Sequence, residues 1–439
     1  MNDTIAAIST PFGEGAIALL RLSGPRAVEV ADTVFRSKVR AAALAPRVQQ
    51  FGAIFDGEEK IDDVLLTVFR APASYTGEDV VEIAGHGGVL VSRRILELLL
   101  RHGARAAEPG EYTQRAYLHG KLDLTQAEAV MDLITAQTDL ALRAATEQLE
   151  GRLGDRIREV REKLLALLAH VEAFIDFPDE DIDPDTGDAL HARLEEVCRL
   201  IDALLDTATR GKVLRNGLRT VIYGAPNVGK SSLLNFLLGQ ERAIVSPQPG
   251  TTRDVIEETI NLRGIPVRLI DTAGVRESDD TIEQAGIERT RLQVERADLI
   301  LQVVDGSIPS TDFRADALIV LNKIDLGEHP SWHAVEGARL SCLSGKGVES
   351  LVDAIAARVT GGSAAQRDWS VAINTRHFDC LQRARLLTTT AQVALDDGLS
   401  PEFVAEELRA ALDAVGEVVG KADSEDVLGK IFSTFCIGK

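Results

Sequence analysis

The chain has 439 residues, of which 45% are apolar and 26% charged, and its formal net charge is −20 at pH 7. At about 150 residues per domain, this length predicts roughly three domains, each with enough apolar residues for a core. There is no apolar run of about 18 residues and no secretion signal, which argues against membrane and secreted proteins and predicts a cytoplasmic one. The negative charge repels nucleic acid, so contact with RNA would need a local basic patch or a partner.

Residues 1–119 predict a small α+β domain, because short β-rich runs alternate there with glycine-marked turns and one amphipathic helical run. The strands are expected at 17–22, 63–69 and 80–83, and the helix at 89–100.

Residues 120–215 change to a helical period rich in Ala, Leu and Glu, and this period returns over residues 362–439. The later helices are expected at 376–395, 401–419 and 424–435. The acidic stretch 176–188 within the first helical part predicts a solvated loop.

Residues 216–361 alternate strands with helices, which predicts a mostly parallel sheet covered on both faces. The strands are expected at 218–223, 256–262, 267–270, 299–304, 318–321 and 338–341. Only eleven residues lie between Asp305 and Ala317, fewer than a normal parallel crossover, which argues against a full helix there. The fold class is therefore multidomain α/β. The α/β domain is inserted into a helical domain built from both flanks, because each flank alone would leave apolar stripes uncovered.

The segment 224–231 (GAPNVGKS) lies between a predicted strand and a predicted helix, the context of a phosphate-binding loop. Its glycines let backbone N–H groups approach a β-phosphate, and Lys230 can neutralise the β- and γ-phosphate oxygens. The Ser231 hydroxyl can ligate Mg²⁺. A glycine turn after a strand is the alternative.

Three further motifs follow in the order that a GTPase needs. The segment 271–274 (DTAG) ends a strand, where Asp271 can hold Mg²⁺ through water and the Gly274 N–H can sense a γ-phosphate. The segment 322–325 (NKID) ends another strand. Asp325 can accept the two N–H groups that guanine presents and adenine lacks, so the base is guanine. The segment 341–343 (SCL) is expected to support the base oxygen.

Thr252, in a loop flanked by glycine and proline, is expected to give the second Mg²⁺ hydroxyl when a γ-phosphate is present. A capped loop threonine is the alternative. The predicted GTP contacts are Asn227, Val228, Gly229, Lys230, Ser231, Ser232, Ser246, Pro247, Gln248, Pro249, Gly250, Thr251, Thr252, Asp271, Thr272, Ala273, Gly274, Asn322, Lys323, Asp325, Ser341, Cys342 and Leu343.

The catalytic candidates are Lys230, Gly274 and Glu283. Ras-type GTPases carry a glutamine directly after the D-x-x-G motif, but Val275 occupies that position here. Water must therefore be positioned by another group. Asn227, with backbone oxygens of Ser246 and Gln248, can hold a monovalent cation in the place of an arginine finger, an element worth about 10³ to 10⁵ in rate. Glu283 can act on water directly or through a second water. From spacing alone, Asn227 is also an ordinary turn residue and Glu283 a solvated helix residue.

These motifs, taken with others along the chain, resemble the MnmE (TrmE) family of tRNA-modification GTPases. The other motifs are 3–5 (DTI), 21–24 (RLSG), 76–79 (TGED), 85–88 (GHGG), 109–113 (PGEYT), 121–124 (KLDL), 126–129 (QAEA), 176–180 (DFPDE) and 435–439 (FCIGK). The resemblance spans essentially the whole chain. It departs from the family at Cys342, where alanine is usual.

The resemblance implies an N-terminal domain that binds a formyl-tetrahydrofolate-type one-carbon donor and mediates homodimerisation, a helical domain and an inserted Ras-like G domain. It implies GTP hydrolysis on K⁺-dependent pairing of G domains. With a flavin-dependent partner, MnmG (GidA), in a heterotetramer, the family adds a carboxymethylaminomethyl or aminomethyl group to the wobble uridine of certain tRNAs.

By matched position, the resemblance also implies ligands and roles. Asn227, Ser246, Gln248 and Thr251 would hold K⁺, Ser231 and Thr252 would hold Mg²⁺, and Glu283 would be the general acid or base. The folate contacts would be Arg21, Glu82, Lys121 and Lys439. The basic side chains can meet the carboxylates of a folate tail, and Glu82 can accept N–H groups of a pterin. Cys436 becomes a candidate functional thiol, with ordinary packing as the alternative.

Two other functions remain open. A ribosome-assembly GTPase would switch without modifying RNA, and it predicts a basic RNA-binding appendage, of which none is clear after Lys323. A folate-binding enzyme with a regulatory GTPase would keep one-carbon transfer without GTP hydrolysis.

Overall fold

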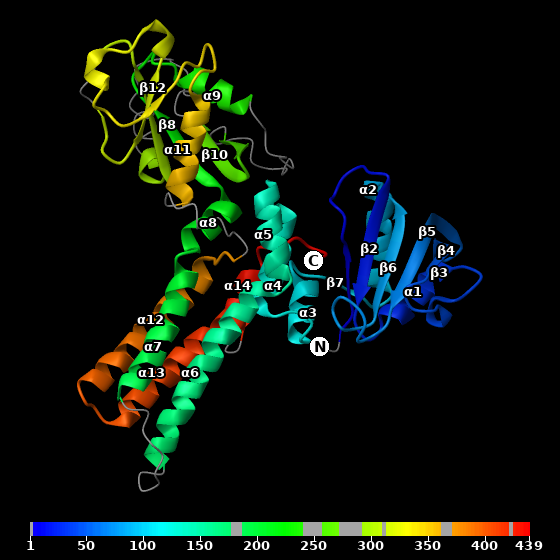
Figure 1. Ribbon diagram of the computed structural model, residues 1–439. Helices are drawn as coiled ribbons and strands as arrows, with labels where there is room; N and C mark the ends of the chain where they lie inside the picture. Colours follow the sequence, from blue (N-terminus) through cyan, green and yellow to red (C-terminus); the bar gives the residue numbers. More distant parts are fainter. Residues whose placement is uncertain are drawn as a thin grey trace. The chain divides into compact units, whose positions relative to one another are not determined.

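The structure is a computed structural model that describes residues 3–176, 187–239, 257–271, 292–309, 313–360, 371–420 and 425–439. The chain divides into two compact units, Met1–Met131 with Gly416–Lys439, and Asp132–Val415 (Figure 1). Most of the predicted acidic loop at 176–188 lies outside the described residues. None of the described helices is both long and apolar enough to cross a membrane.

The first unit is built on a mixed sheet of seven strands in the order β3-β4-β5-β6-β2-β1-β7. Neighbouring strands are antiparallel, except that β1 and β7 are parallel. The strands are β1 (Ile5–Ile8), β2 (Ile17–Ser23), β3 (Phe35–Arg36), β4 (Gln49–Asp56), β5 (Glu59–Phe69), β6 (Val80–His86) and β7 (Arg105–Ala106). The helices are α1 (Ala27–Val34), the short η1 (Ala41–Ala43), α2 (Val89–Arg101), α3 (Glu111–Leu118), α4 (Leu124–Thr135), which runs into the second unit, and α14 (Glu425–Phe432).

Side chains alternate between the two faces of this sheet, and α1 and α2 pack on one of them. Leu20 and Leu22 of β2 share a core cluster with both helices, so Arg21 between them faces the opposite side. Arg21 is the register partner of Glu82 on β6. The alternation therefore places a basic and an acidic side chain side by side on the face opposite α1 and α2.

A buried ion network joins the start of the chain to α3. Arg115 is fully buried and lies 2.8 Å from Asp3, 2.9 Å from Glu111 and 3.1 Å from Glu78. Burial by itself would raise the pKa of Asp3 and of Glu111, but hydrogen bonds and charge from Arg105 and Arg115 outweigh it and hold both pKa values below their ordinary range. Arg105 and Arg115 thus keep Asp3 and Glu111 ionised, and Arg115 ties three segments together.

The C-terminal segment docks on the start of α3 and the end of β1, within the first unit. Ile437 forms an isolated antiparallel bridge with Pro109, and the Ser9 hydroxyl donates to the carbonyl of Gly438 over 3.3 Å. Ser9 lies two residues beyond Ala7, the β1 residue that pairs in register with Arg21, and Lys439 directly follows the Gly438 that Ser9 contacts.

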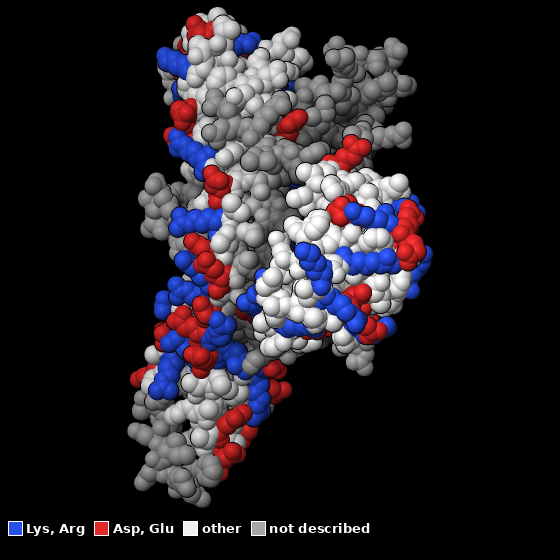
Figure 2. Space-filling model, turned by 90° about the vertical axis from the view of Figure 1, so that its right-hand side faces the viewer, with Lys and Arg blue, Asp and Glu red and all other residues white. Residues whose placement is uncertain are grey.

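Basic and acidic side chains are mixed on the face shown in Figure 2, where described Lys and Arg residues alternate with Asp and Glu. Many described arginines of the chain pair with carboxylates, such as Arg94 with Glu59 at 2.8 Å. The described part of this face therefore presents no broad basic surface.

In the second unit, helices that precede the sheet region in the sequence pack against helices that follow it. They are α5 (Asp139–Leu149), α6 (Arg152–Asp176), α7 (Gly187–Leu205) and α8 (Ala208–Asn216) before the sheet, and α12 (Thr375–Asp396) and α13 (Pro401–Val419) after it. Arg385 of α12 donates to Asp202 of α7 over 2.8 Å. A Cβ at Gly211 of α8 would lie 2.2 Å from the carbonyl oxygen of Ile373, so glycine permits the close approach of the two chain segments there.

The second unit also contains a six-stranded sheet in the order β13-β12-β11-β8-β10-β9, which is parallel apart from the β9–β10 hairpin. Its strands are β8 (Leu218–Tyr223), β9 (Glu257–Leu262), β10 (Ile265–Asp271), β11 (Leu299–Asp305), β12 (Leu318–Asn322) and β13 (Ala338–Arg339). The helices of this region are α9 (Lys230–Leu238), η2 (Ile324–Leu326), η3 (Pro330–Trp332) and α11 (Val348–Thr360).

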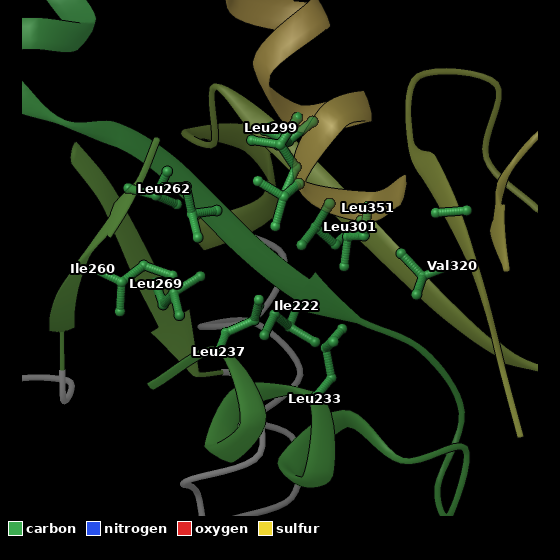
Figure 3. Packing of buried hydrophobic residues seen from close by; sticks show 14 of the residues in the cluster. Ile222, Leu233, Leu237, Ile260, Leu262, Leu269, Leu299, Leu301, Val320 and Leu351 are labelled. Carbon is green, nitrogen blue, oxygen red and sulfur yellow. The ribbon is translucent and has the colours of Figure 1, made fainter. Parts of the chain in front are cut away.

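Both faces of this sheet are buried. Leu233 and Leu237 lie one turn apart on α9 and, with Leu351 of α11, point into the core on one face (Figure 3). Val221 and Val304 contribute to a second cluster on the other face. The near-continuous apolar strands thus have the burial that a parallel sheet requires. The predicted multidomain α/β fold class is confirmed.

The segment between β11 and β12 was expected to be too short for a full helix. A tryptophan covers this part of the sheet instead. The described residues of this segment, 306–309 and 313–316, form no helix. Fully buried Trp332 from η3 packs in the cluster on that face, and its ring nitrogen donates to the carbonyl of Ile308 over 2.8 Å. The indole supplies apolar area that a crossover helix would otherwise provide.

We predict that Arg115→Leu destabilises the first unit by about 3 to 5 kcal/mol near neutral pH, because Glu78 loses its buried counter-charge and Glu111 keeps only the half-exposed Arg105. The loss should shrink as the pH falls below about 4.5, the ordinary pKa of Glu111, because Glu111 needs no cation once it is protonated. Hydrogen exchange of peptides from β1 and α3 measures this stability at both pH values.

Arg93→Leu is the matched control, because it removes an exposed arginine that pairs with Glu97 over 2.7 Å in the same unit. Its effect should stay within about 0.5 kcal/mol. Equal effects of the two substitutions, or an Arg115→Leu effect independent of pH, would contradict the prediction.

Candidate nucleotide-binding site

The loop between β8 and α9 has the backbone of an anion cradle. The φ angle is +64° at Asn227 and +102° at Gly229, and it is negative at Val228 between them. Alternating backbone handedness of this kind turns successive N–H groups into one concavity. Gly229 is the N-cap of α9, whose first N–H groups have no partner within the helix. The predicted phosphate-binding loop therefore has a geometry that fits a phosphate.

Lys230 lies against the loop that it is predicted to serve. Its ammonium group donates to the carbonyls of Gly224 over 2.9 Å and Ala225 over 2.8 Å. The next residues, Ser231 and Ser232, are exposed in the first turn of α9. The Ser231 hydroxyl is therefore accessible to a metal ion bound by phosphates.

Asn322, the last residue of β12, joins the phosphate-binding loop to the segment 341–343. Its amide nitrogen donates to the carbonyl of Val228 over 2.9 Å, and its oxygen accepts from the N–H of Cys342 over 3.1 Å. A Cβ at Gly229 would lie 2.1 Å from that amide nitrogen, so the contact requires glycine there. The sequence predicted Asn322 as a nucleotide contact, but the structure gives it this bridging position.

Lys323 follows in a left-handed conformation with φ +64°, and its ammonium group lies 2.7 Å from Asp305 at the end of β11. Burial alone would raise the pKa of Asp305, but hydrogen bonds from Lys323 and Ser307 hold it below its ordinary value. Asp305 stays ionised and anchors the lysine. Sequence reasoning missed this aspartate, although its place at a strand end was visible.

Asp325 lies exposed in η2, where its carboxylate can reach a ligand. Burial, and then the charge of Asp325, raise the pKa of the Cys342 thiol to about 11. The Cys342 thiol is therefore neutral. This fits a small packing residue at a position where the family usually has alanine. Ser341 is fully buried, whereas 89% of Leu343 is exposed.

Several predicted residues fall outside the described part of the chain. They are Ser246, Pro247, Gln248, Pro249, Gly250, Thr251, Thr252, Thr272, Ala273, Gly274 and Glu283. The backbone of Asp271 is described, and it pairs with Ile222 at the end of β8. Asp271 therefore ends its strand beside the start of the phosphate-binding loop.

The folate candidates all lie in the first unit. Arg21 and Glu82 are in contact, with 2.7 Å between Nη2 and Oε1. Lys121 is exposed and donates to the carbonyl of Pro72 over 3.2 Å. Lys439 is half-buried at the docked C-terminal segment, beside the exposed Cys436.

Sequence reasoning did not single out Tyr75 and Tyr112, which lie near Arg21, although both stand in or beside the motifs 76–79 and 109–113. Their rings lie 5.6 Å and 5.7 Å from the guanidinium carbon of Arg21.

Two family models match the chain. A model of the MnmE helical domain matches residues 124–436, and a model of the GTP-binding protein TrmE N-terminus matches residues 4–121. The tRNA modification GTPase MnmE of Akkermansia muciniphila is 52% identical and covers 99% of this chain and 99% of its own. The proteins of that name from Alkaliphilus metalliredigens and Aquifex aeolicus are each 45% identical over 100% of both chains. The chain belongs to the MnmE family of tRNA modification GTPases.

Membership in the family confirms the predicted resemblance and makes the chain a GTP hydrolase of tRNA modification. GTP is its nucleotide, with Mg²⁺ as the ion that GTP hydrolysis implies. Among solved structures, the G domain of the T. maritima FeoB iron transporter aligns with 32% of this chain and 96% of its own, at 25% identity and a TM-score of 0.24. That score is too low to support an argument. The roles of individual residues stay predictions.

We predict that Asn322→Ala weakens binding of GDP and GTP by roughly 10- to 100-fold, because the Val228 carbonyl and the Cys342 N–H both lose a buried partner. Fluorescence titration with a labelled guanine nucleotide measures the affinity. Asn374→Ala is the control, because Asn374 is the N-cap of α12 and its side chain accepts from the N–H of His377 in that helix. It should lower stability by about 1 kcal/mol and leave affinity unchanged. Wild-type affinity in Asn322→Ala would show that the bridge does not shape the site.

Proposed function

We propose that the chain, as a homodimer with a flavin-dependent partner of the MnmG (GidA) type, adds a carboxymethylaminomethyl or aminomethyl group to the wobble uridine of certain tRNAs. The added carbon comes from a formyl-tetrahydrofolate-type donor, and GTP hydrolysis orders the reaction. The observation that carries the proposal is the assembled nucleotide site, with Lys230 and Asn322 in place, in a chain of this family.

Support for the one-carbon donor comes from the Arg21–Glu82 pair. The exposed fractions of the two side chains are 14% and 24%. Both guanidinium donors reach the same oxygen, Oε1, at 3.0 Å and 2.7 Å. Among the described residues, no hydrogen bond reaches Glu82 Oε2 or leaves Arg21 Nη1. Glu82 Oε2 can thus accept from a ligand and Arg21 Nη1 can donate to it, which fits the amide-like edge of a pterin ring. Lys121 and Lys439 would meet its carboxylates.

Support for a protein partner comes from charge. The net charge is −20, and the described part of the face in Figure 2 mixes both signs. Because binding of a nucleic-acid backbone depends on clustered cations, a second protein would supply much of the grip on tRNA.

Mass spectrometry of tRNA nucleosides from cells that lack this chain tests the proposal. The aminomethyl-type wobble uridine should be absent, and a plasmid copy of the wild type should restore it. Lys230→Ala should not restore it, because the phosphates lose their cation. Lys60→Ala is the matched control, since Lys60 is half-exposed and pairs with Asp63 far from the nucleotide loop in sequence.

Two outcomes would favour the other functions. An unchanged nucleoside profile would favour a ribosome-assembly switch. Restoration by Lys230→Ala would favour a folate enzyme with a regulatory GTPase.

Support for K⁺ comes from Asn227, which is exposed on the phosphate-binding loop in the left-handed conformation. Its side-chain oxygen can join a cation site next to the phosphates, with Ser246, Gln248 and Thr251 as the other proposed ligands.

We predict that replacing K⁺ by Na⁺ lowers the GTP hydrolysis rate by roughly 10- to 1,000-fold, because the ion takes the place of an arginine finger. Asn227→Ala should be slow in both salts and show no difference between them. Steady-state phosphate release in each salt measures this. Equal rates of the wild type in K⁺ and Na⁺ would reject a cation at this position.

A further inference from the structure

Two tyrosines from different segments hold the guanidinium of Arg21. Tyr75 lies in the loop before β6, and Tyr112 lies in the first turn of α3. The distances from the guanidinium carbon to the ring centroids are 5.6 Å and 5.7 Å, both within the range of cation–π attraction. Because Arg21 also pairs with Glu82, three side chains fix one guanidinium.

The two rings are anchored by their hydroxyl groups in different ways. The Tyr112 hydroxyl donates to the backbone carbonyl of Arg21 over 2.6 Å, and the side chain is fully buried. The Tyr75 hydroxyl lies 2.9 Å from the hydroxyl of buried Thr113. Burial raises the pKa of both phenols, so they stay neutral. Tyr112 is part of the core, whereas Tyr75 is half-buried.

An arginine whose side chain is already held in one conformation is well suited to bind a ligand. A free arginine side chain has about 2 kcal/mol of rotamer entropy to lose when it binds a ligand. Aromatic contacts that already restrict Arg21 reduce this loss, which is the general advantage of preorganisation. The donor and acceptor that remain on Arg21 and Glu82 then keep a fixed spacing.

We propose that Tyr75 and Tyr112 are positioning residues for Arg21 and Glu82, and that the ring of Tyr75, not its hydroxyl, sets the affinity for a pterin-type one-carbon donor. This inference rests on the proposed folate function. Tyr75 acts through Arg21 and takes no part in nucleotide binding.

Calorimetric titration of the full-length chain with a stable formyl-tetrahydrofolate tests the inference. Tyr75→Leu should bind roughly 5- to 30-fold more weakly, the loss expected for one partly desolvated cation–π contact. Tyr75→Phe should bind within about twofold of the wild type, because it keeps the ring. Tyr75→Met, which fills the space without a ring, should resemble Tyr75→Leu.

Tyr117→Leu is the matched control. Tyr117 is also half-buried on α3, but its hydroxyl donates to the carbonyl of Gly420. This variant should keep the wild-type affinity for the folate. All variants should keep the wild-type rate of GTP hydrolysis, which also shows that they fold.

The outcomes separate the two proposals. If the wild type does not bind the folate, the proposed one-carbon donor is wrong, and the inference falls with it. If the wild type binds and both Tyr75→Leu and Tyr75→Met bind equally well, the ring does not position Arg21. If Tyr75→Phe is as weak as Tyr75→Leu, the hydroxyl and not the ring carries the effect, and the inference is overturned. Equal weakening by Tyr117→Leu would reduce the effect to general destabilisation.

Discussion

The nucleotide site depends on one carboxamide, that of Asn322. The residue is 3% exposed, and its side chain donates to the Val228 carbonyl and accepts from the Cys342 N–H. A carboxamide carries its donor and its acceptor on two separate atoms, so one side chain can pair with two backbone groups at once. A carboxylate would leave the carbonyl facing an anion, and an apolar residue would leave both groups unpaired at a cost of about 1 to 3 kcal/mol each. The phosphate loop and the base loop therefore keep a fixed spacing.

The parallel sheet makes this contact possible. Asn322 pairs in register with Asp305, and Asp271 pairs with Ile222, so the polar residues all stand where strands end. Within the strands, both faces are covered, and apolar side chains fill them. The polar residues of the candidate site thus lie at one edge, where the carboxyl ends of parallel strands meet and where ligands bind in such folds.

Local patterns predicted many of the elements, although the strands β1, β3, β4 and β7 were not expected, and long-range contacts could not be predicted. The expected strand 218–223 is β8, and the expected helix 401–419 is α13, each with the same bounds. Motif spacing also identified the phosphate loop. By contrast, Asn322 contacts Val228 across 94 residues, and Arg115 contacts Asp3 across 112. Periodicity describes a residue's own element, so it does not say which distant loop meets a strand end. The bridge between Ile437 and Pro109 could not be predicted from the sequence for the same reason.

The pairing of Arg21 with Glu82 also limits what can bind there. Each side chain is mostly buried, so a ligand that engaged only one of them would leave a desolvated charge without its partner. A simple carboxylate, which can only accept hydrogen bonds, would satisfy Arg21 but repel Glu82. A heterocycle with a donor beside an acceptor can satisfy both and leave the Arg21–Glu82 contact intact. The paired charges of Arg21 and Glu82 therefore favour a ring with an amide-like edge over a free carboxylate. In the proposed one-carbon donor, the acidic tail would need other cations.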